Sequence, residues 1–210
     1  MNVPSYRAYS SAEDKRNVVS FEAPPPVKGW PTPWLTQDEF NHYMLPLYEH
    51  NWRTTIETQK QIQAEGTQST HALGTFLEKT FAFDDSRSCF AALQSIHELC
   101  EKEKHHCEWT GGGRLDGKNA VTIPVCTHTA MRPEWPEDGS GSQIAPARGR
   151  KVPGITLRDV RFAILLDQTL ACQVSKDPPT HTPAMRRDQY TWDEFQHRCR
   201  AGLGFEKARA

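Results

Sequence analysis

The sequence predicts a single α+β domain at about residues 34–175, and three observations support this prediction. Two long segments place apolar residues at helical spacing behind a residue that can cap a helix. Shorter segments between them alternate apolar and polar residues, as half-buried strands do. The expected order is helix, strand, strand, helix, strand, strand, helix, without an internal repeat. Residues 1–33 are expected to be a proline-rich, flexible arm and residues 176–210 a polar tail.

The first expected helix begins behind Thr36, which can cap it together with Glu39 three residues later. Pro46 lies inside this pattern and should kink or shorten the helix. Residues 60–71 are polar and predict a loop. The next stretch, 72–83, alternates well enough to be a strand.

The clearest helix is expected over residues 85–104, with Asp84 or Asp85 as its cap. Its apolar stripe should pack on a sheet that contains 76–83 and 120–128. The residues of this stripe are Cys89, Ala92, Leu93, Ile96, Leu99 and Cys100.

A strand is expected over residues 120–128, after a glycine-rich turn. Pro124 has no N–H to donate, so this strand should be at an edge or irregular there. A long loop at 129–153 follows, and then a second strong helix behind Thr156. The apolar residues expected to be buried in the strand are Val121, Ile123 and Val125, and those in the helix are Val160, Ala163, Leu166 and Leu170. A further short helix is expected around 190–199.

Composition and charge exclude several classes of function. The 210 residues carry a formal net charge of -1, so we expect neither nucleic acid nor a membrane surface as a partner. No apolar run approaches the roughly 20 residues that a membrane span needs, and the first residues lack the apolar core of a secretory signal. The expected location is cytoplasmic, with a mitochondrial leader as the weaker alternative. The six cysteines show no CxxC spacing and are expected to be free thiols.

Three histidines, His105, His106 and His128, are the candidate catalytic residues. The alternatives are a polar surface, a metal site and acid–base chemistry. A metal site is disfavoured, because adjacent side chains diverge instead of facing one ion, and we expect no metal. Imidazole titrates near neutrality and can both give and take a proton. Histidines on two separate elements suit a reaction that protonates one atom of a flat substrate and deprotonates another.

The stretches that carry these residues resemble one family. "EKEKHHCEW", residues 101–109, looks like its signature E-K-x-x-H-H-P-x-W. "NAVTIPVCTH", residues 119–128, is similar to its N-x-V-x-I-x-L-x-T-H strand, and "GITLRD", residues 154–159, to its G-L-[ST]-x-[RK]-D helix start. The family is that of the pterin-4a-carbinolamine dehydratases, and the resemblance covers about residues 35–172.

The resemblance implies an antiparallel four-stranded sheet with helices packed on one face, assembled as a homodimer or homotetramer. It implies dehydration of 4a-hydroxytetrahydropterin to quinonoid dihydropterin in tetrahydrobiopterin recycling, with no cofactor and no metal. By motif position, His105 and His128 resemble the family's acid–base histidines, and His106 its substrate-binding histidine. The substrate-binding or supporting residues matched in the same way are Glu101, Trp109, Thr127 and Asp159.

The chain departs from the family pattern at three places. Cys107 stands where the motif has proline, Pro124 interrupts the strand that leads to His128, and the loop after His128 is longer than the family needs. Two alternatives therefore stay open: a dehydratase fold adapted to another acid–base reaction, and a non-enzymatic dimerisation cofactor or assembly protein that binds a protein partner through its arms. Asp159 also has a purely structural alternative, because an acid is favoured in the first turn of a helix.

Overall fold

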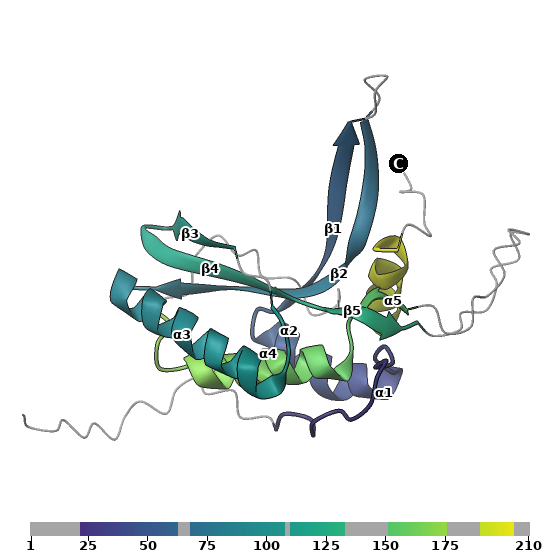
Figure 1. Ribbon diagram of the computed structural model, residues 1–210, viewed down its shortest axis with the longest axis horizontal. Helices are drawn as coiled ribbons and strands as arrows, with labels where there is room; N and C mark the ends of the chain where they lie inside the picture. Colours follow the sequence, from purple (N-terminus) through teal and green to yellow (C-terminus); the bar gives the residue numbers. More distant parts are fainter. Residues whose placement is uncertain (1–21, 63–67, 108–109, 133–150, 176–189, 204–210) are drawn as a thin grey trace, which may run out of the picture.

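The computed structural model describes residues 22–62, 68–107, 110–132, 151–175 and 190–203. Its α+β architecture and four-stranded antiparallel sheet confirm the predicted fold class. The larger sheet has the strand order β1-β2-β4-β3, and β5 and β6 form a second, two-stranded sheet. The long helices α3 and α4 lie along one face of the larger sheet (Figure 1). The strands are β1 (Arg53–Ile62), β2 (Gln68–Phe83), β3 (Thr110–Leu115), β4 (Lys118–Val125), β5 (Thr127–Met131) and β6 (Lys151–Gly154). The helices are α1 (Gln37–Glu39), the π-helical η1 (Phe40–Met44), α2 (Leu45–Glu49), α3 (Ser86–Glu103), α4 (Leu157–Leu170) and α5 (Trp192–Ala201).

The first helix changes its hydrogen-bonding pattern before Pro46 instead of ending there. Thr36 caps it in the predicted capping box: its hydroxyl accepts from the Glu39 N–H at 3.3 Å, and its own N–H donates to the Glu39 carboxylate at 2.8 Å. In the π-helical turn that follows, the N–H of Leu45 donates to the carbonyl of Phe40. Pro46 then lies in the first turn of α2, where the missing N–H costs least.

The prediction of a loop at 60–71 is largely wrong, because residues 60–62 belong to β1 and residues 68–71 to β2. β2 pairs with β4 only over Leu77–Phe83, so no third strand is paired with the outer part of the β1–β2 hairpin within the described ranges. Figure 1 shows this part of the hairpin projecting from the rest of the fold. The sequence of residues 60–71 does not alternate between apolar and polar residues, so it lacks the pattern from which strands are predicted. The predicted strand at 72–83 is confirmed as part of β2.

The core lies between the larger sheet and its two long helices. Asp85 caps α3, and the residues that α3 buries most are Ala92, Ile96 and Leu99. The other side of the predicted stripe, with Cys100 at its end, is only half-buried. The sheet residues that meet these helices in one apolar cluster are Leu77, Phe81, Phe83, Val121, Ile123 and Val125.

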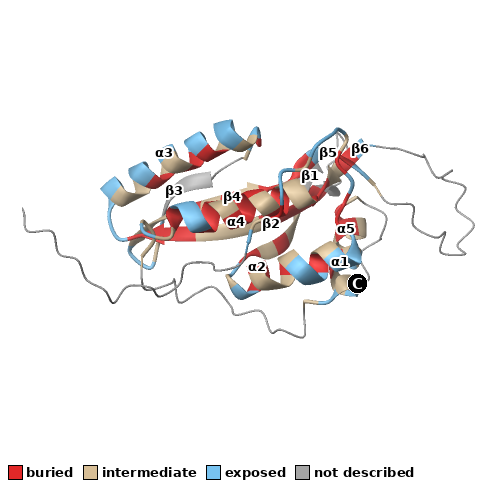
Figure 2. Ribbon diagram, turned by 90° about the horizontal axis from the view of Figure 1, so that it is seen from below, coloured by how far each residue is buried: buried red, intermediate tan, exposed pale blue. Residues whose placement is uncertain are grey.

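Helix α4 is buried on more than one side (Figure 2). Thr156 is its N-cap, as predicted. The predicted stripe is fully buried, and so are the neighbouring Phe162 and Ile164. The stripe consists of Val160, Ala163, Leu166 and Leu170. This helix therefore runs through the centre of the fold, with one end at the candidate histidines.

The strand predicted over 120–128 is two strands, which is a correction. β4 ends at Val125, and β5 begins at Thr127 and pairs with β6. The break follows Pro124. The described pairing between β4 and β3 ends at Thr122, so Pro124 costs no hydrogen bond to β3. The ends of the predicted loop 129–153 belong to β5 and β6, and its residues 133–150 lie outside the described part.

The N-terminal segment fixes the smaller sheet and the start of α4. The N–H of Trp34 donates to the carbonyl of Met131 at 3.1 Å, and that of Leu35 donates to the carbonyl of Ile155 at 3.2 Å. The Trp34 ring lies against Gly154, where an added Cβ would come within 2.2 Å of the indole. Only glycine fits at this position, one residue after the long predicted loop.

The short helix predicted around 190–199 is confirmed as α5. Its Phe195 and Cys199 are buried, and the Phe195 ring lies 5.1 Å from that of Phe40. Across the described ranges, no helix combines the length and the apolar character needed to cross a membrane.

Candidate active site

Asp159 is the centre of a buried polar network that joins the three motif stretches. It lies in the first turn of α4 and is 0% exposed. One carboxylate oxygen accepts from the Thr156 N–H at 2.6 Å, from the Thr156 hydroxyl at 2.7 Å and from the Thr127 hydroxyl at 2.9 Å. The other oxygen lies 2.8 Å from Nε2 of His105. Asp159 is an acceptor in all four contacts, which is the role of a carboxylate.

His105 is held at the end of α3 by a left-handed residue. Lys104 has φ 51 and ψ 42 and ends the helix, and the chain then turns back toward α4. Two arginines of α4 bind this end of α3. Arg161 donates from Nε and Nη2 to the two Glu103 carboxylate oxygens at 2.8 and 3.1 Å, and Arg158 donates to the Lys104 carbonyl at 3.1 Å. The position of His105 therefore depends on both helices.

Both ring nitrogens of His105 face acceptors. Nε2 meets the Asp159 carboxylate, and Nδ1 lies 2.9 Å from the carbonyl of His106. Only the imidazolium form donates from both nitrogens. Burial lowers the pKa of His105, but the hydrogen bond to Asp159, its negative charge and the His106 carbonyl outweigh burial, and the pKa is raised above its ordinary value. The ring is 7% exposed and stacks on Phe162 at 4.7 Å.

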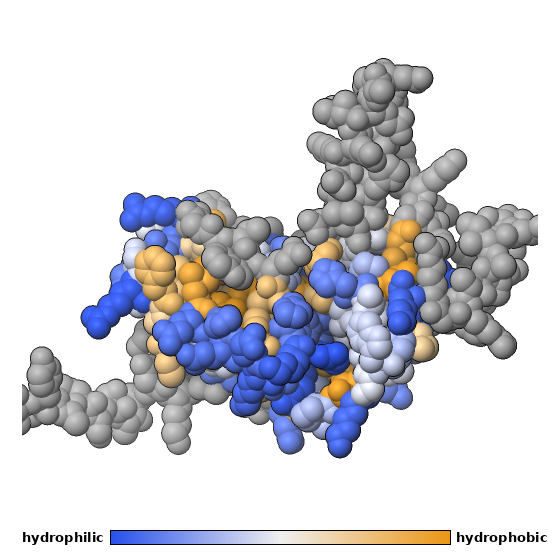
Figure 3. All heavy atoms as spheres, viewed as in Figure 1, coloured by the Kyte–Doolittle hydropathy of each residue, from blue (hydrophilic) through white to orange (hydrophobic). Residues whose placement is uncertain are grey.

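The other two histidines are exposed. His106 follows His105 directly, and its side chain faces solvent. His128 follows Thr127 in β5, and its Nδ1 lies 3.9 Å from the Cys126 sulfur. The three candidate histidines therefore divide into one buried ring with acceptors at both nitrogens and two rings that are accessible to solvent. Figure 3 shows hydrophilic residues over the surface where α3 ends, with apolar residues visible between α3 and the sheet.

The remaining predicted site residues have different surroundings. Thr127 is part of the network around Asp159. Glu101 is exposed on α3 and lies 3.6 Å from the Lys104 ammonium, so the structure does not bring it into this network. Trp109 lies outside the described residues. Among the described residues, no three His, Cys, Asp or Glu side chains are grouped as a metal-binding cluster.

Sequence reasoning missed two residues of the site. It assigned Thr156 only to the helix cap, although its hydroxyl and N–H both donate to Asp159. It did not include Phe162, whose ring covers His105. Thr156 has a signal in the sequence, because a capping threonine followed three residues later by an acid forms a capping box. Phe162 has none, because its contact depends on how α3 and α4 pack.

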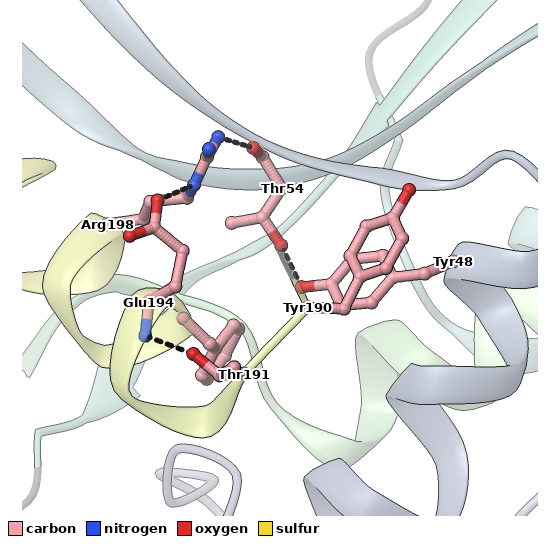
Figure 4. Close-up of a pocket in the computed structure, with 7 residues that line it drawn as sticks. Tyr48, Thr54, Tyr190, Thr191, Glu194 and Arg198 are labelled. Carbon is pink, nitrogen blue, oxygen red and sulfur yellow. Dashed lines mark hydrogen bonds and ion pairs between the residues drawn. The ribbon is translucent and has the colours of Figure 1, made fainter. Parts of the chain in front are cut away.

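A small cavity elsewhere in the fold lies between α5, β1 and α2 (Figure 4). The Tyr48 hydroxyl lies 2.6 Å from that of Thr54, the Tyr190 ring stacks on Tyr48 at 4.2 Å, and Arg198 donates to the Glu194 carboxylate at 2.7 Å and to the Thr54 carbonyl at 3.0 Å. Burial raises the pKa of Tyr48. A volume of about 10 Å³ holds at most one water molecule, and no motif residue lines it. This cavity is therefore a packing feature.

Comparison with known proteins identifies the domain. The family model of pterin 4 alpha carbinolamine dehydratase matches residues 33–132, which include all three candidate histidines. No curated protein matches the chain. The resemblance drawn from the motif stretches is thereby confirmed. Residues 33–132 of the chain therefore match the pterin 4 alpha carbinolamine dehydratase family.

Proposed function

We propose that this chain dehydrates a 4a-hydroxytetrahydropterin to the quinonoid dihydropterin by histidine acid–base catalysis, without a metal. Membership of a dehydratase family supports the class of reaction. In the reaction, the C4a–O bond breaks, the hydroxyl leaves as water after it receives a proton, and N5 loses its proton as the C4a–N5 double bond forms. The protein therefore needs one group that gives a proton and one that takes a proton.

The observation that supports this proposal most is the buried pair of His105 and Asp159. An imidazolium that donates from both nitrogens is an acid that already carries the proton the leaving hydroxyl needs. After His105 gives up its Nδ1 proton, the Asp159 carboxylate still holds the Nε2 proton, which fixes the tautomer of the neutral ring. The His106 carbonyl lies 2.9 Å from Nδ1 and occupies its hydrogen bond, so this carbonyl has to move away before Nδ1 can give its proton to the substrate.

The two exposed imidazoles take the remaining roles in the proposal. His128 removes the proton from N5, because it comes from a different element, the strand β5, and its ring is exposed. His106 binds the pterin ring system. The Cys126 sulfur lies 3.9 Å from Nδ1 of His128.

A stopped-flow assay of 4a-hydroxytetrahydropterin dehydration tests these roles. His105→Ala and His128→Ala should each slow turnover by roughly 10²–10⁴-fold, the usual contribution of a general acid or base. His106→Ala should mainly raise KM, because a binding residue acts on ground state and transition state alike. His97→Ala is the matched control, since this histidine is exposed on α3 and carries no role in the proposal. Equal loss in all four variants would contradict the assignment of roles.

A further inference from the structure

Two cysteines meet at the end of α3, beside the candidate site. The N–H groups of Lys104 and His105 both donate to the carbonyl of Cys100, so the chain folds back over the last turn of the helix. This turn brings the Cys107 sulfur to 3.3 Å from the Cys100 sulfur. Both side chains are half-buried, so small molecules in solution can reach them.

The two thiols differ in acidity. The hydrogen bond from the Cys107 thiol lowers the pKa of Cys100 to about 6, although partial burial opposes this effect. The same hydrogen bond and burial raise the pKa of Cys107. Of the two thiols, Cys100 is therefore the one that loses its proton first. A thiolate beside a thiol is the arrangement of an attacking and a resolving cysteine.

We propose that hydrogen peroxide oxidises Cys100 and Cys107 to a disulfide, and that this disulfide fixes the turn that carries His105 and His106. The Cys100 thiolate attacks one peroxide oxygen, the O–O bond breaks, and the departing hydroxide takes up a proton to leave as water. Cys107 then attacks the Cys100 sulfenic sulfur, the S–S bond forms, and the oxygen leaves as a second water with the Cys107 proton. Two thiols and one peroxide thus give one disulfide and two waters.

The geometry makes the closure a local movement. A disulfide brings its sulfurs to about 2.05 Å, so the pair has to approach by little more than 1 Å from its present separation. The closed ring contains Lys104, His105 and His106. It would hold the His106 carbonyl on the His105 ring, where it blocks transfer of the Nδ1 proton. This consequence for catalysis rests on the proposed dehydratase function, whereas the disulfide itself does not.

The other cysteines provide controls. Cys89 is half-buried on the same helix, and burial raises its pKa, so it should react more slowly than Cys100. Cys172 is exposed, which makes it the reference for an ordinary surface thiol. Cys126 and Cys199 are buried.

Peptide mapping of the peroxide-treated full-length chain tests the proposal. Remaining thiols are alkylated, and trypsin should release residues 88–102 joined to residues 105–114. Because the first peptide also contains Cys89, the cross-link has to persist in Cys89→Ser and disappear in Cys100→Ser and Cys107→Ser. In Cys107→Ser, Cys100 should accumulate as a sulfenic acid that dimedone traps. Dithiothreitol should restore both thiols.

Two results would overturn the proposal. One is alkylation of Cys100 and Cys107 as free thiols in a sample in which Cys172 has been oxidised. The other is a cross-link that joins two chains instead of closing within one. A separate arm compares the dehydration rates of the oxidised and the re-reduced chain. If the disulfide fixes the turn, the dehydration rate of the oxidised form should be roughly tenfold lower or more, and equal rates would refute this effect. Thiol mapping does not depend on activity, so a chain that lacks dehydratase activity can still confirm or refute the disulfide.

Discussion

Replacement of Asp159 by asparagine should lower the pKa of the buried His105 ring. Asparagine has the same size, and its carbonyl can still accept from Thr156 and Thr127. It carries no charge, however, and its amide can donate to His105. Burial, which lowers the pKa of His105, is then no longer outweighed. We expect the pKa of His105 to fall below its ordinary value of about 6.5.

The cost in stability follows from the burial of both partners. Asp159 is 0% exposed and His105 is 7% exposed, so solvent hardly screens the pair. Removing one partner of a buried ion pair costs about 3–5 kcal/mol, and we expect the lower end, about 3 kcal/mol, because asparagine keeps some hydrogen bonds.

The pH dependence has a defined sign. The folded-state pKa of His105 is raised, so the stabilisation is complete below the pKa of the unfolded chain and is lost as the pH rises through the folded-state pKa. The difference in the free energy of unfolding between wild type and Asp159→Asn should therefore be largest near pH 6 and shrink above the folded-state pKa of His105. Urea denaturation at several pH values and NMR titration of the His105 ring measure both quantities.

Asp193→Asn is the matched control, because Asp193 is an exposed acid in the first turn of α5. Its effect on the free energy of unfolding should stay within about 0.5 kcal/mol. The reasoning is refuted if His105 titrates at or below its ordinary pKa in the wild type. It is also refuted if Asp159→Asn leaves the His105 titration unchanged.

Three further predictions concern packing, a second ion pair and metal. Gly154→Ala should lower the free energy of unfolding by about 1–3 kcal/mol or more, because the new Cβ overlaps the Trp34 indole, and urea denaturation measures the loss. Lys79→Ala should cost about 3–5 kcal/mol in the same measurement. It removes the ammonium that lies 2.6 Å from the buried Asp167 carboxylate in the wild type. A cost below about 1 kcal/mol would contradict this prediction. A chelator should leave the dehydration rate unchanged, and elemental analysis showing one metal ion per chain that is lost in His128→Ala would contradict a metal-free site.

The helices and their caps could be predicted from the sequence because their signals are local. Thr36, Asp85 and Thr156 all cap the helices they were expected to cap. The strands were predictable only where one face is buried. The polar arm at 60–71 and the break at Cys126 depend on which strands pair, and pairing is a property of the whole sheet.

The candidate site shows the same division. Motif spacing selected His105, Thr127 and Asp159, and the structure joins these three in one network. Their burial could not be predicted, because His105 and Asp159 are 54 residues apart and meet only through the packing of α3 on α4. The departure from the motif at Cys107 was visible in the sequence, whereas its 3.3 Å contact with Cys100 required the turn at Lys104.

The most direct test is the rate of 4a-hydroxytetrahydropterin dehydration with wild-type protein and with the double variant His105→Ala/His128→Ala, each compared with the spontaneous reaction in buffer. Dehydration also proceeds slowly in water, so the background has to be measured at the same pH. We predict a clear acceleration by the wild type and a rate close to background for the folded double variant. If the folded wild-type protein gives no acceleration, the enzymatic function is wrong, and the non-enzymatic alternative, binding of a protein partner, takes its place.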